Sequence, residues 1–251
     1  DEVGELLAPY LKEAGYNYVE LLPLSEHPCD ESWGYAKHGL LRAYQPVWNR
    51  PGTEEDDKPS PPGGHWRTFR FCSGAFRGGR LRPGAFFDGT PLYEYPHPAV
   101  GVSEWGSYNF MHSRGEVRSF LQSCARYWLE EYHLDGLRMD AISRLLYWQG
   151  EEARGVNGNG AAFLREMNRG LKEHCPGCML IAEDSTSYPD VTKPVEEGGL
   201  GFDYKWDLGW MHDTLEYFQT GPEYRSRDYH KLTFSMMYFY NERYLLPLSH
   251  R

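Results

Sequence analysis

The sequence predicts an α/β protein built on a parallel β-sheet. Amphipathic stretches of helical pattern alternate with short apolar runs four times along the 251 residues. A repeated order of helix then strand is typical of a parallel sheet, closed as a (β/α)8 barrel or open as a doubly wound sheet. Neither GxGxxG nor GxxxxGK(S/T) follows any of the apolar runs, which disfavours a nucleotide-binding fold.

The first two rounds of helix and strand occupy residues 4–24 and 115–142. In the first round, Leu7 and Leu11 lie on one helical face, and the apolar run after Gly15 reads as a strand. In the second round, a helical stripe of apolar residues is followed by the strand-like sequence "LDGLRMDAI". Each round predicts one helix that leads into one strand.

The third and fourth rounds follow the same order. A helix over about 161–174 leads into "CMLIAEDS", which reads as a buried strand. The last round runs from the helical pattern "WMHDTLEYFQ" through residues 231–244 to "LLPLSH", the last expected strand. A hydrophobic content of 40% is enough to build a core for a chain of this length.

The composition narrows the classes of partner. A net charge of −10 disfavours a protein that holds phosphate backbones, because that affinity comes from clustered Lys and Arg. The sequence shows no apolar run of about 18 residues and no recognisable secretory leader. We therefore expect a cytoplasmic protein without nucleic-acid or membrane partners, and the oligomeric state stays open.

The aromatic residues and the cysteines could contribute to a functional site, but neither residue type identifies the function. The aromatic content of 16% exceeds what a core needs, and flat rings at a cleft grip sugars or bases, although aromatic side chains also fill cores. The five cysteines are an odd number, which favours a reducing compartment. Cys175 and Cys178 have CxxC spacing, but one such pair without a second is more often incidental than a metal or redox site.

The segment "GLRMDA", residues 136–141, places two charged residues in a strand-like run. Side chains alternate along a strand, so Arg138 and Asp140 share one face. Leu137 and Met139 share the opposite face. In a parallel barrel, charged side chains at the carboxyl end of a strand lie at the barrel mouth, where active sites occur.

A second carboxylate ends the next strand. Glu183 closes "LIAED" one helical crossover after Asp140, so we expect both carboxylates at the same rim. Such a pair suits retaining glycoside chemistry, in which one carboxylate is the nucleophile and the other, with a raised pKa, is acid and then base. Arg138 would keep Asp140 ionised. The residues alone leave an alternative open, in which Arg138 and Asp140 form a structural ion pair that caps the strand.

Four stretches resemble one known family: "YVELLPLSEHPCDESWGY", "EEYHLDGLRMDAISRLLYWQG", "IAEDSTSYPDVTKPVEEGGLGFDYKWDLGWMHDTLEYF" and "NERYLLPLSH". They are similar to the catalytic barrel of bacterial 1,4-α-glucan branching enzymes, of the α-amylase superfamily. The resemblance covers residues 1–35 and 87–250. It is specific, because "GFDYKWDLGWMHDT" and "FDGTPLYEYPHP" look like branching enzymes rather than amylases in general.

The resemblance implies a partial (β/α)8 barrel that acts on an α-1,4-glucan. Asp140 would be the nucleophile, Glu183 the general acid and base, and Arg138 the partner of the nucleophile. Tyr35 would line the subsite beside the cleaved bond, and His250 would hold sugar hydroxyls in the transition state. The family cuts the glucan, holds the piece as a glycosyl-enzyme and passes it to a 6-hydroxyl, with no metal or cofactor in that chemistry.

The chain also departs from the family pattern. Arg251 stands where the family has its third carboxylate, directly after His250. The family's first and last barrel strands are missing, and a barrel cannot close without its edge strands. We therefore expect one incomplete barrel domain over residues 1–251, impaired or inactive as written. Without the resemblance, Tyr35 and His250 would be interpreted as a packed aromatic residue and a surface histidine.

Residues 36–86 depart most from the family. They show little periodicity, carry five arginines within residues 67–82, and lack the family's third strand with its motif close to "DWVPAHF". Codons read one base later can spell "RAGIGVLFDSVPAHFAVDDY" over residues 62–81, which resembles the family. We therefore expect an irregular segment produced by two compensating frame shifts. A genuine insertion and a basic RNA-binding tract are the alternatives.

Two alternatives to branching remain open on the sequence. A non-catalytic protein could bind glucan through an aromatic-rich rim. An α-glucan hydrolase of the same superfamily could use the same covalent intermediate, with water in place of a sugar hydroxyl as the attacking group. The predicted site residues are common to transfer and hydrolysis and do not separate them.

Overall fold

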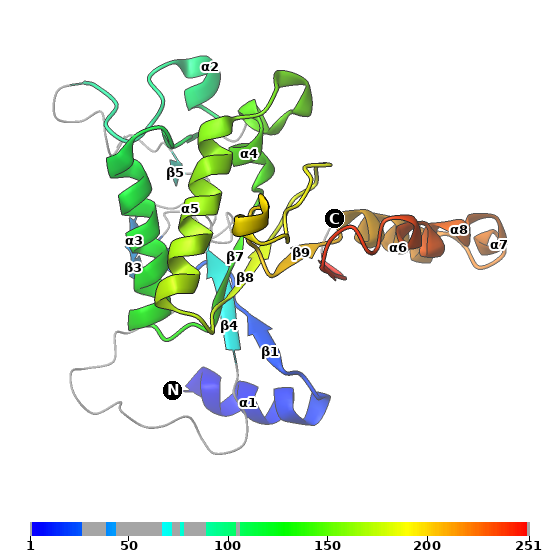
Figure 1. The fold of residues 1–251 in the computed structure, drawn as a ribbon. Helices are drawn as coiled ribbons and strands as arrows, with labels where there is room; N and C mark the ends of the chain where they lie inside the picture. Colours follow the sequence, from blue (N-terminus) through cyan, green and yellow to red (C-terminus); the bar gives the residue numbers. More distant parts are fainter. Residues whose placement is uncertain are drawn as a thin grey trace.

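A six-stranded parallel β-sheet forms the centre of the protein in the computed structural model (Figure 1). The structure describes residues 2–26, 39–43, 67–71, 76–77, 89–103 and 106–249. The strands, in their order across the sheet, are β1 (Tyr18–Glu20), β4 (Arg67–Phe71), β7 (Gly136–Met139), β8 (Met179–Ala182), β9 (Tyr204–Trp206) and β10 (Tyr244–Leu245). All neighbouring strands in this sheet pair in parallel.

The strand order distinguishes the two parallel architectures. Across the sheet, the strands follow their order in the chain without a reversal. A doubly wound sheet reverses its strand order at a switch point, whereas a (β/α)8 barrel adds each new strand on the same side. The described sheet therefore has the arrangement of a barrel segment, and the predicted α/β class is confirmed.

Helices precede most of the strands, as predicted. α1 (Glu2–Ala14) leads into β1, α3 (Gly115–Glu131) into β7, α5 (Gly158–His174) into β8 and α6 (Leu208–Gln219) into β10. α3 and α5 lie side by side on one face of the sheet, and α6 lies away from them beyond β9 (Figure 1). The long helices α5 and α6 have side-chain caps on their first turns: Asn157 accepts from the Gly160 N–H, and Asp207 from the Trp210 N–H.

Shorter elements complete the described chain. Two antiparallel pairs join β2 (Ser25–Glu26) to β3 (Gly39–Ala43) and β5 (Phe76–Arg77) to β6 (Ser107–Tyr108). The short helices are α2 (Pro98–Gly101), α4 (Ser143–Leu146), α7 (Arg225–Asp228) and α8 (His230–Thr233), with 3-10 turns at Trp148–Gly150, Glu152–Arg154, Val195–Glu197 and Phe234–Met237. Within the described ranges, every helix is too short or too polar to cross a membrane.

Part of the segment 36–86 is more regular than expected. Its described residues form β3, β4 and β5, so the prediction of an irregular segment is wrong at these positions. β4 lies between β1 and β7, where the resemblance places the third strand. The physical reason is that β1 and β7 each leave a row of backbone groups unpaired there, and an extended segment that reaches the gap satisfies both rows.

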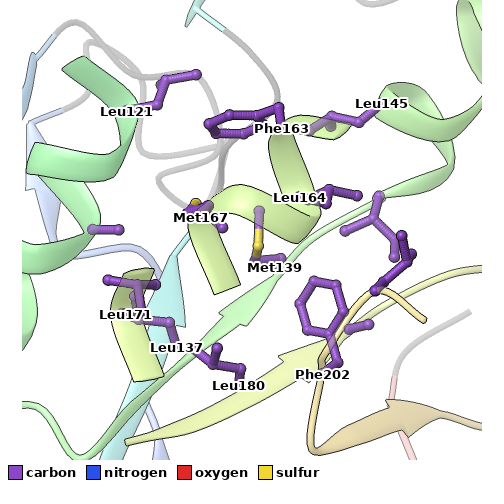
Figure 2. Close-up of a cluster of buried hydrophobic side chains, with 14 of the residues drawn as sticks. Leu121, Leu137, Met139, Leu145, Phe163, Leu164, Met167, Leu171, Leu180 and Phe202 are labelled. Carbon is purple, nitrogen blue, oxygen red and sulfur yellow. The ribbon is translucent and has the colours of Figure 1, made fainter. Parts of the chain in front are cut away.

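The core fills the space between the sheet and the helices α3 and α5 (Figure 2). Leu137 and Met139 project from β7 into this core, with 1% and 0% of their surface exposed. Phe163, from α5, belongs to the same buried cluster. Since side chains alternate along a strand, Arg138 and Asp140 are left for the opposite side of the sheet, as predicted.

The last two strands differ from the prediction. The stretch that forms β9 has the polar Lys205 between two aromatic residues, so its pattern does not stand out as a strand. It becomes one because β8 and β10 pair with it on its two sides. β10 covers Tyr244–Leu245 rather than the whole of residues 245–250.

Candidate active site

One buried guanidinium gathers three carboxylates where the strands end. Arg138 lies on β7, and solvent reaches none of its side chain. Its Nε donates to Glu20 Oε1 across 2.6 Å, its Nη2 lies 3.0 Å from Asp140 Oδ1, and its Nη1 donates to Glu183 Oε2. The structure therefore brings together the three predicted residues Arg138, Asp140 and Glu183, and it adds Glu20.

Glu20 is absent from the predicted site, although its position offers the same signal. It is the last residue of β1, just as Asp140 and Glu183 directly follow β7 and β8. A carboxylate at the carboxyl end of a parallel strand is the pattern that identifies the other two. Glu20 stands inside the apolar run "YVELLPL", without an arginine beside it to draw attention to its charge.

The ring of Trp206 covers the guanidinium. The Cζ atom of Arg138 lies 4.4 Å from the centroid of the Trp206 ring, on β9. A cation over the face of an indole is attracted by the ring's quadrupole, most strongly where water is excluded. Residues from β1, β9 and the ends of β7 and β8 thus hold Arg138 in place.

Asp140 and Glu183 stand level on neighbouring strands. β7 and β8 pair in parallel up to Met139 and Ala182, so the next residue of each strand lies beside the other. The Glu183 N–H donates to Met139 O across 2.8 Å, and the Ile142 N–H donates to Glu183 O across 2.9 Å. Backbone hydrogen bonds therefore set the spacing of the two carboxylates.

The chain turns sharply directly after Asp140. Ala141 has a φ of 47°, in the left-handed region that residues other than glycine rarely adopt. This turn directs the Ile142 N–H toward Glu183 and leads into α4. Strained backbone of this kind is concentrated at functional sites, where the surrounding structure holds it in place.

Glu183 and Glu20 hold their protons more tightly than usual. Burial first, and then the hydrogen bond and charge of Asp140, together raise the pKa of Glu183 to about 8 against the opposing effect of Arg138. Burial is also the largest reason that the pKa of Glu20 is raised, again against the effect of Arg138. At neutral pH, Glu183 is therefore protonated and can donate a hydrogen bond to Asp140.

A cavity of about 710 Å³ lies beside this cluster. Trp206, whose ring covers Arg138, forms part of its wall. Three tyrosines, Tyr188, Tyr238 and Tyr244, line it together with polar side chains. Its volume is in the range of small-molecule sites, and a wall of aromatic and polar groups suits the flat faces and hydroxyls of a sugar.

The structure describes only some of the remaining residues singled out in the sequence. Tyr35 and His250 fall in residues 27–38 and 250–251, outside the described part of the chain, so their roles stay predictions. Cys175 and Cys178 are described, and both thiols are free. They precede the amino end of β8, whereas the cluster lies at the carboxyl ends of the strands.

Comparison with known proteins relates the whole chain to one group of enzymes. The chain is 43% identical over 258 residues to the 1,4-alpha-glucan branching enzyme GlgB of Fusobacterium nucleatum subsp. nucleatum, across 99% of its length. It is 42% identical, across 100% of its length, to enzymes of the same name from Francisella tularensis subsp. mediasiatica and Oleidesulfovibrio alaskensis. Along its whole length the chain is thus similar to bacterial branching enzymes.

The chain aligns with only part of these relatives. The alignments cover 40% of the Fusobacterium protein and 41% of the other two, so the chain spans about two fifths of their length. No family model matches the sequence. The relationship therefore rests on the identity to individual proteins along the whole chain.

Solved structures share the fold at low sequence identity. A protein of Salmonella typhimurium matches 91% of this chain with a TM-score of 0.62 and 20% identity, over 38% of its own chain. An alpha-amylase from Geobacillus thermoleovorans, solved in complex with acarbose, matches 82% of the chain and 44% of its own, with a TM-score of 0.56 and 15% identity. These likenesses establish an α-amylase-type fold.

Proposed function

We propose that this chain carries the catalytic centre of a glucan branching transglycosylase. The reaction cleaves an α-1,4-glucan and transfers the released chain to a 6-hydroxyl, which forms an α-1,6 branch. The observation behind the proposal is the placement of Asp140 and Glu183, level on adjacent strands and joined through Arg138, in a homologue of enzymes with that name. Because the chain spans two fifths of those relatives, the reaction is proposed for the whole protein.

The first step forms a covalent glycosyl-enzyme. A carboxylate oxygen of Asp140 attacks C1 of the glucosyl unit, the C1–O4 bond breaks, and Glu183 gives its proton to the departing O4. The raised pKa of Glu183 supports this role, because a general acid must carry its proton at the working pH. Arg138 contacts Asp140 and favours its ionised form, which is the nucleophile.

The second step makes the branch. Glu183, now a carboxylate, takes the proton from a 6-hydroxyl of the acceptor glucan. The acceptor oxygen attacks C1, the bond from C1 to Asp140 breaks, and Asp140 returns as a carboxylate. Two displacements at C1 retain the α configuration of the linkage.

The closeness of the two carboxyl groups favours double over single displacement. Glu183 and Asp140 share a side-chain hydrogen bond. An inverting enzyme separates its carboxyl groups by about 6.5–9.5 Å to place a water between them. A hydrogen-bonded pair leaves no such room, so the geometry supports a covalent intermediate.

We assign the glucan to the cavity beside Trp206, whose wall carries the aromatic rings that sugars prefer. Tyr35 at the subsite next to the cleaved bond and His250 at the sugar hydroxyls belong to the same proposal, on the strength of the resemblance. The net charge of −10 suits a neutral polysaccharide better than a nucleic acid. The odd number of cysteines supports a cytoplasmic location.

We further propose that the chain as written is a single incomplete barrel domain with impaired turnover. Arg251 stands where the family has its third carboxylate. Residues 36–86, which we attribute to two compensating frame shifts, lack the aspartate motif that the family carries on its third strand. Both departures remove groups that the family places at the sugar.

Amylose incubated with the protein made from its natural gene, flanking coding sequence included, tests the proposed function. Branching is expected to lower the iodine absorbance and to create α-1,6 linkages that isoamylase removes, while the number of reducing ends stays constant. A rise in reducing ends would assign hydrolysis instead. Co-sedimentation with glucan without either change would assign binding alone.

Three variants sharpen this test. Asp140→Asn should abolish transfer, and Glu183→Gln should slow it by roughly 10²–10⁴-fold, both without loss of the fold. Glu130→Gln, which breaks an exposed ion pair with Arg126 on α3, should leave transfer unchanged. Undiminished transfer by Glu183→Gln would refute the role of Glu183 as the acid.

A further inference from the structure

Arg138 is surrounded by more negative charge than its own positive charge requires. One carboxylate compensates a buried guanidinium, yet Glu20, Asp140 and Glu183 all contact Arg138. With all three ionised, three negative charges against one positive charge would leave −2 at a site with little water. Surplus charge of this kind is costly to bury and is characteristic of functional sites rather than of ion pairs that only stabilise a fold.

Glu20 reaches Arg138 from a strand that is not its neighbour. β4 separates β1 from β7, and the strand register sets Glu20 level with Phe69, and Phe69 level with Gly136. Two strand spacings amount to roughly 10 Å. The side chain of Arg138 must therefore extend across β4 to meet Glu20, and this contact fixes the direction in which the guanidinium points.

The contacts of Arg138 use different parts of a rigid group. Its Nε binds Glu20, which turns the terminal nitrogens Nη1 and Nη2 toward Glu183 and Asp140. The guanidinium is planar, so holding one edge sets the place of the other nitrogens. Trp206 covers one face of the plane. Without Glu20, the edge that carries Nε would lose the contact that orients it.

We propose that Glu20 is a positioning residue that holds the Nε edge of Arg138. Through this contact, Glu20 becomes the third carboxylate, beside Asp140 and Glu183, that interacts with the single positive charge of the guanidinium. The inference rests on the proposed function for the catalytic meaning of Asp140 and Glu183. Its consequence is electrostatic. Charge that Arg138 shares with ionised Glu20 is less available to stabilise the Glu183 anion, and Glu183 therefore keeps its proton to a higher pH.

The charged neighbours of these carboxyl groups are few. Asp140 and Arg138 act on Glu183, and the same two residues act on Glu20. On β9, the nearest cation in sequence to Trp206 is Lys205, which is paired with Asp184. Among the side chains that the structure describes, Arg138 is thus the cation through which Glu20 influences Glu183.

An NMR titration of ¹³C-labelled glutamate carboxyl groups in the 251-residue chain tests the inference without an activity assay. The midpoint of Glu183 is identified in the titration by its loss in Glu183→Gln. In Glu20→Gln this midpoint is expected to fall by about one pH unit. Without the charge of Glu20, Arg138 interacts with only two carboxylates and stabilises the Glu183 anion more strongly. Glu20→Asp keeps the charge and is expected to keep the midpoint.

Asp203→Asn is the matched control. Asp203 pairs with Lys172 across 2.6 Å and its side chain is 30% exposed, against 2.6 Å and 29% for Glu20. Both substitutions therefore remove one negative charge at an equally exposed carboxylate, and only Glu20 is paired with Arg138. An unchanged midpoint in Glu20→Gln, or an equal fall in Asp203→Asn, would overturn the inference.

A measurement on the unsubstituted chain covers the case in which Glu20→Gln does not fold. The ¹⁵N resonance of Arg138 Nε is expected to move with the titration of Glu20, whose pKa burial raises. An Nε resonance that does not respond in that pH range would overturn the inference. The proposed function is tested separately. A protein that shows these titrations but transfers no glucan would refute the proposed function and leave the inference about Glu20 standing.

Discussion

The ammonium group of Lys205 donates to Asp184 Oδ2 across 2.8 Å, and protein surrounds both side chains, which are 7% and 0% exposed. Asp184 directly follows Glu183, and Lys205 lies on β9. Lys205 also donates to the Thr186 carbonyl, while Asp184 accepts from the Thr186 N–H and hydroxyl. The pair therefore ties the loop that begins at Glu183 to the next strand of the sheet.

Breaking this pair should destabilise the fold. Lys205→Met is expected to cost about 3–5 kcal/mol, because it leaves a buried carboxylate without its cation. Lys205→Met with Asp184→Asn removes both charges but keeps an acceptor for Thr186, so it should recover most of that loss. Urea unfolding measures both. Lys231→Met, which breaks a pair with the half-exposed Glu216, should cost under about 1 kcal/mol. A double variant as unstable as Lys205→Met would exclude charge pairing as the cause.

The pKa of Glu183 predicts the alkaline limit of the proposed reaction. Only the protonated carboxyl can give a proton to the leaving oxygen, so kcat/KM should fall as the pH rises through about 8. Glu183→Gln should slow the reaction by roughly 10²–10⁴-fold and remove this dependence. Transfer rates measured from neutral to alkaline pH check the prediction. A rate that stays constant well above pH 8 would assign the proton to another group.

His112 should make the fold sensitive to acid. It is 5% exposed, and neither ring nitrogen has a hydrogen-bond partner among the described residues. Burial, together with the charge of Arg118, lowers its pKa to about 4. Below its ordinary pKa of about 6.5, the unfolded chain binds a proton that the folded chain does not. Stability that is present above that pH is therefore lost as the pH falls toward 4.

Urea unfolding at pH 7 and pH 5 measures this effect. The shift of His112 should remove about 2 kcal/mol of stability between the two pH values. His112→Phe should lack that part of the pH dependence, whereas His212→Gln, at an exposed histidine of α6, should keep it. The same loss in His112→Phe as in the unsubstituted chain would contradict the prediction.

The segment 36–86 gives a prediction at the level of the gene. If two compensating shifts produced it, the encoding DNA between the codons of Tyr35 and Phe87, read one base later, will spell the aspartate-containing strand of the family. That reading puts "VLFDS" at residues 67–71, where the structure has β4. Codons that fit only the written frame would make the segment a genuine feature of the protein.

Much of the site could be predicted from local pattern. The alternation on β7 separates Leu137 and Met139, which enter the core, from Arg138, which does not. The rule that parallel strands carry functional side chains at their carboxyl ends brings Glu183 to Asp140. Local pattern could not predict β9 or the position of Trp206, because a strand of three residues takes its conformation from the strands that pair with it.

The sequence by itself determined the alternation of helix and strand around β1, β7 and β8 and the placement of Asp140 and Glu183 at the rim, because these follow from periodicities of a few residues. Only the tertiary structure decided that Glu20, 118 residues from Arg138, shares its guanidinium. That contact depends on the position of β1 two strands from β7 and on a side chain long enough to cross β4. Distances between strands arise from the pairing of the whole sheet, and no local pattern contains them.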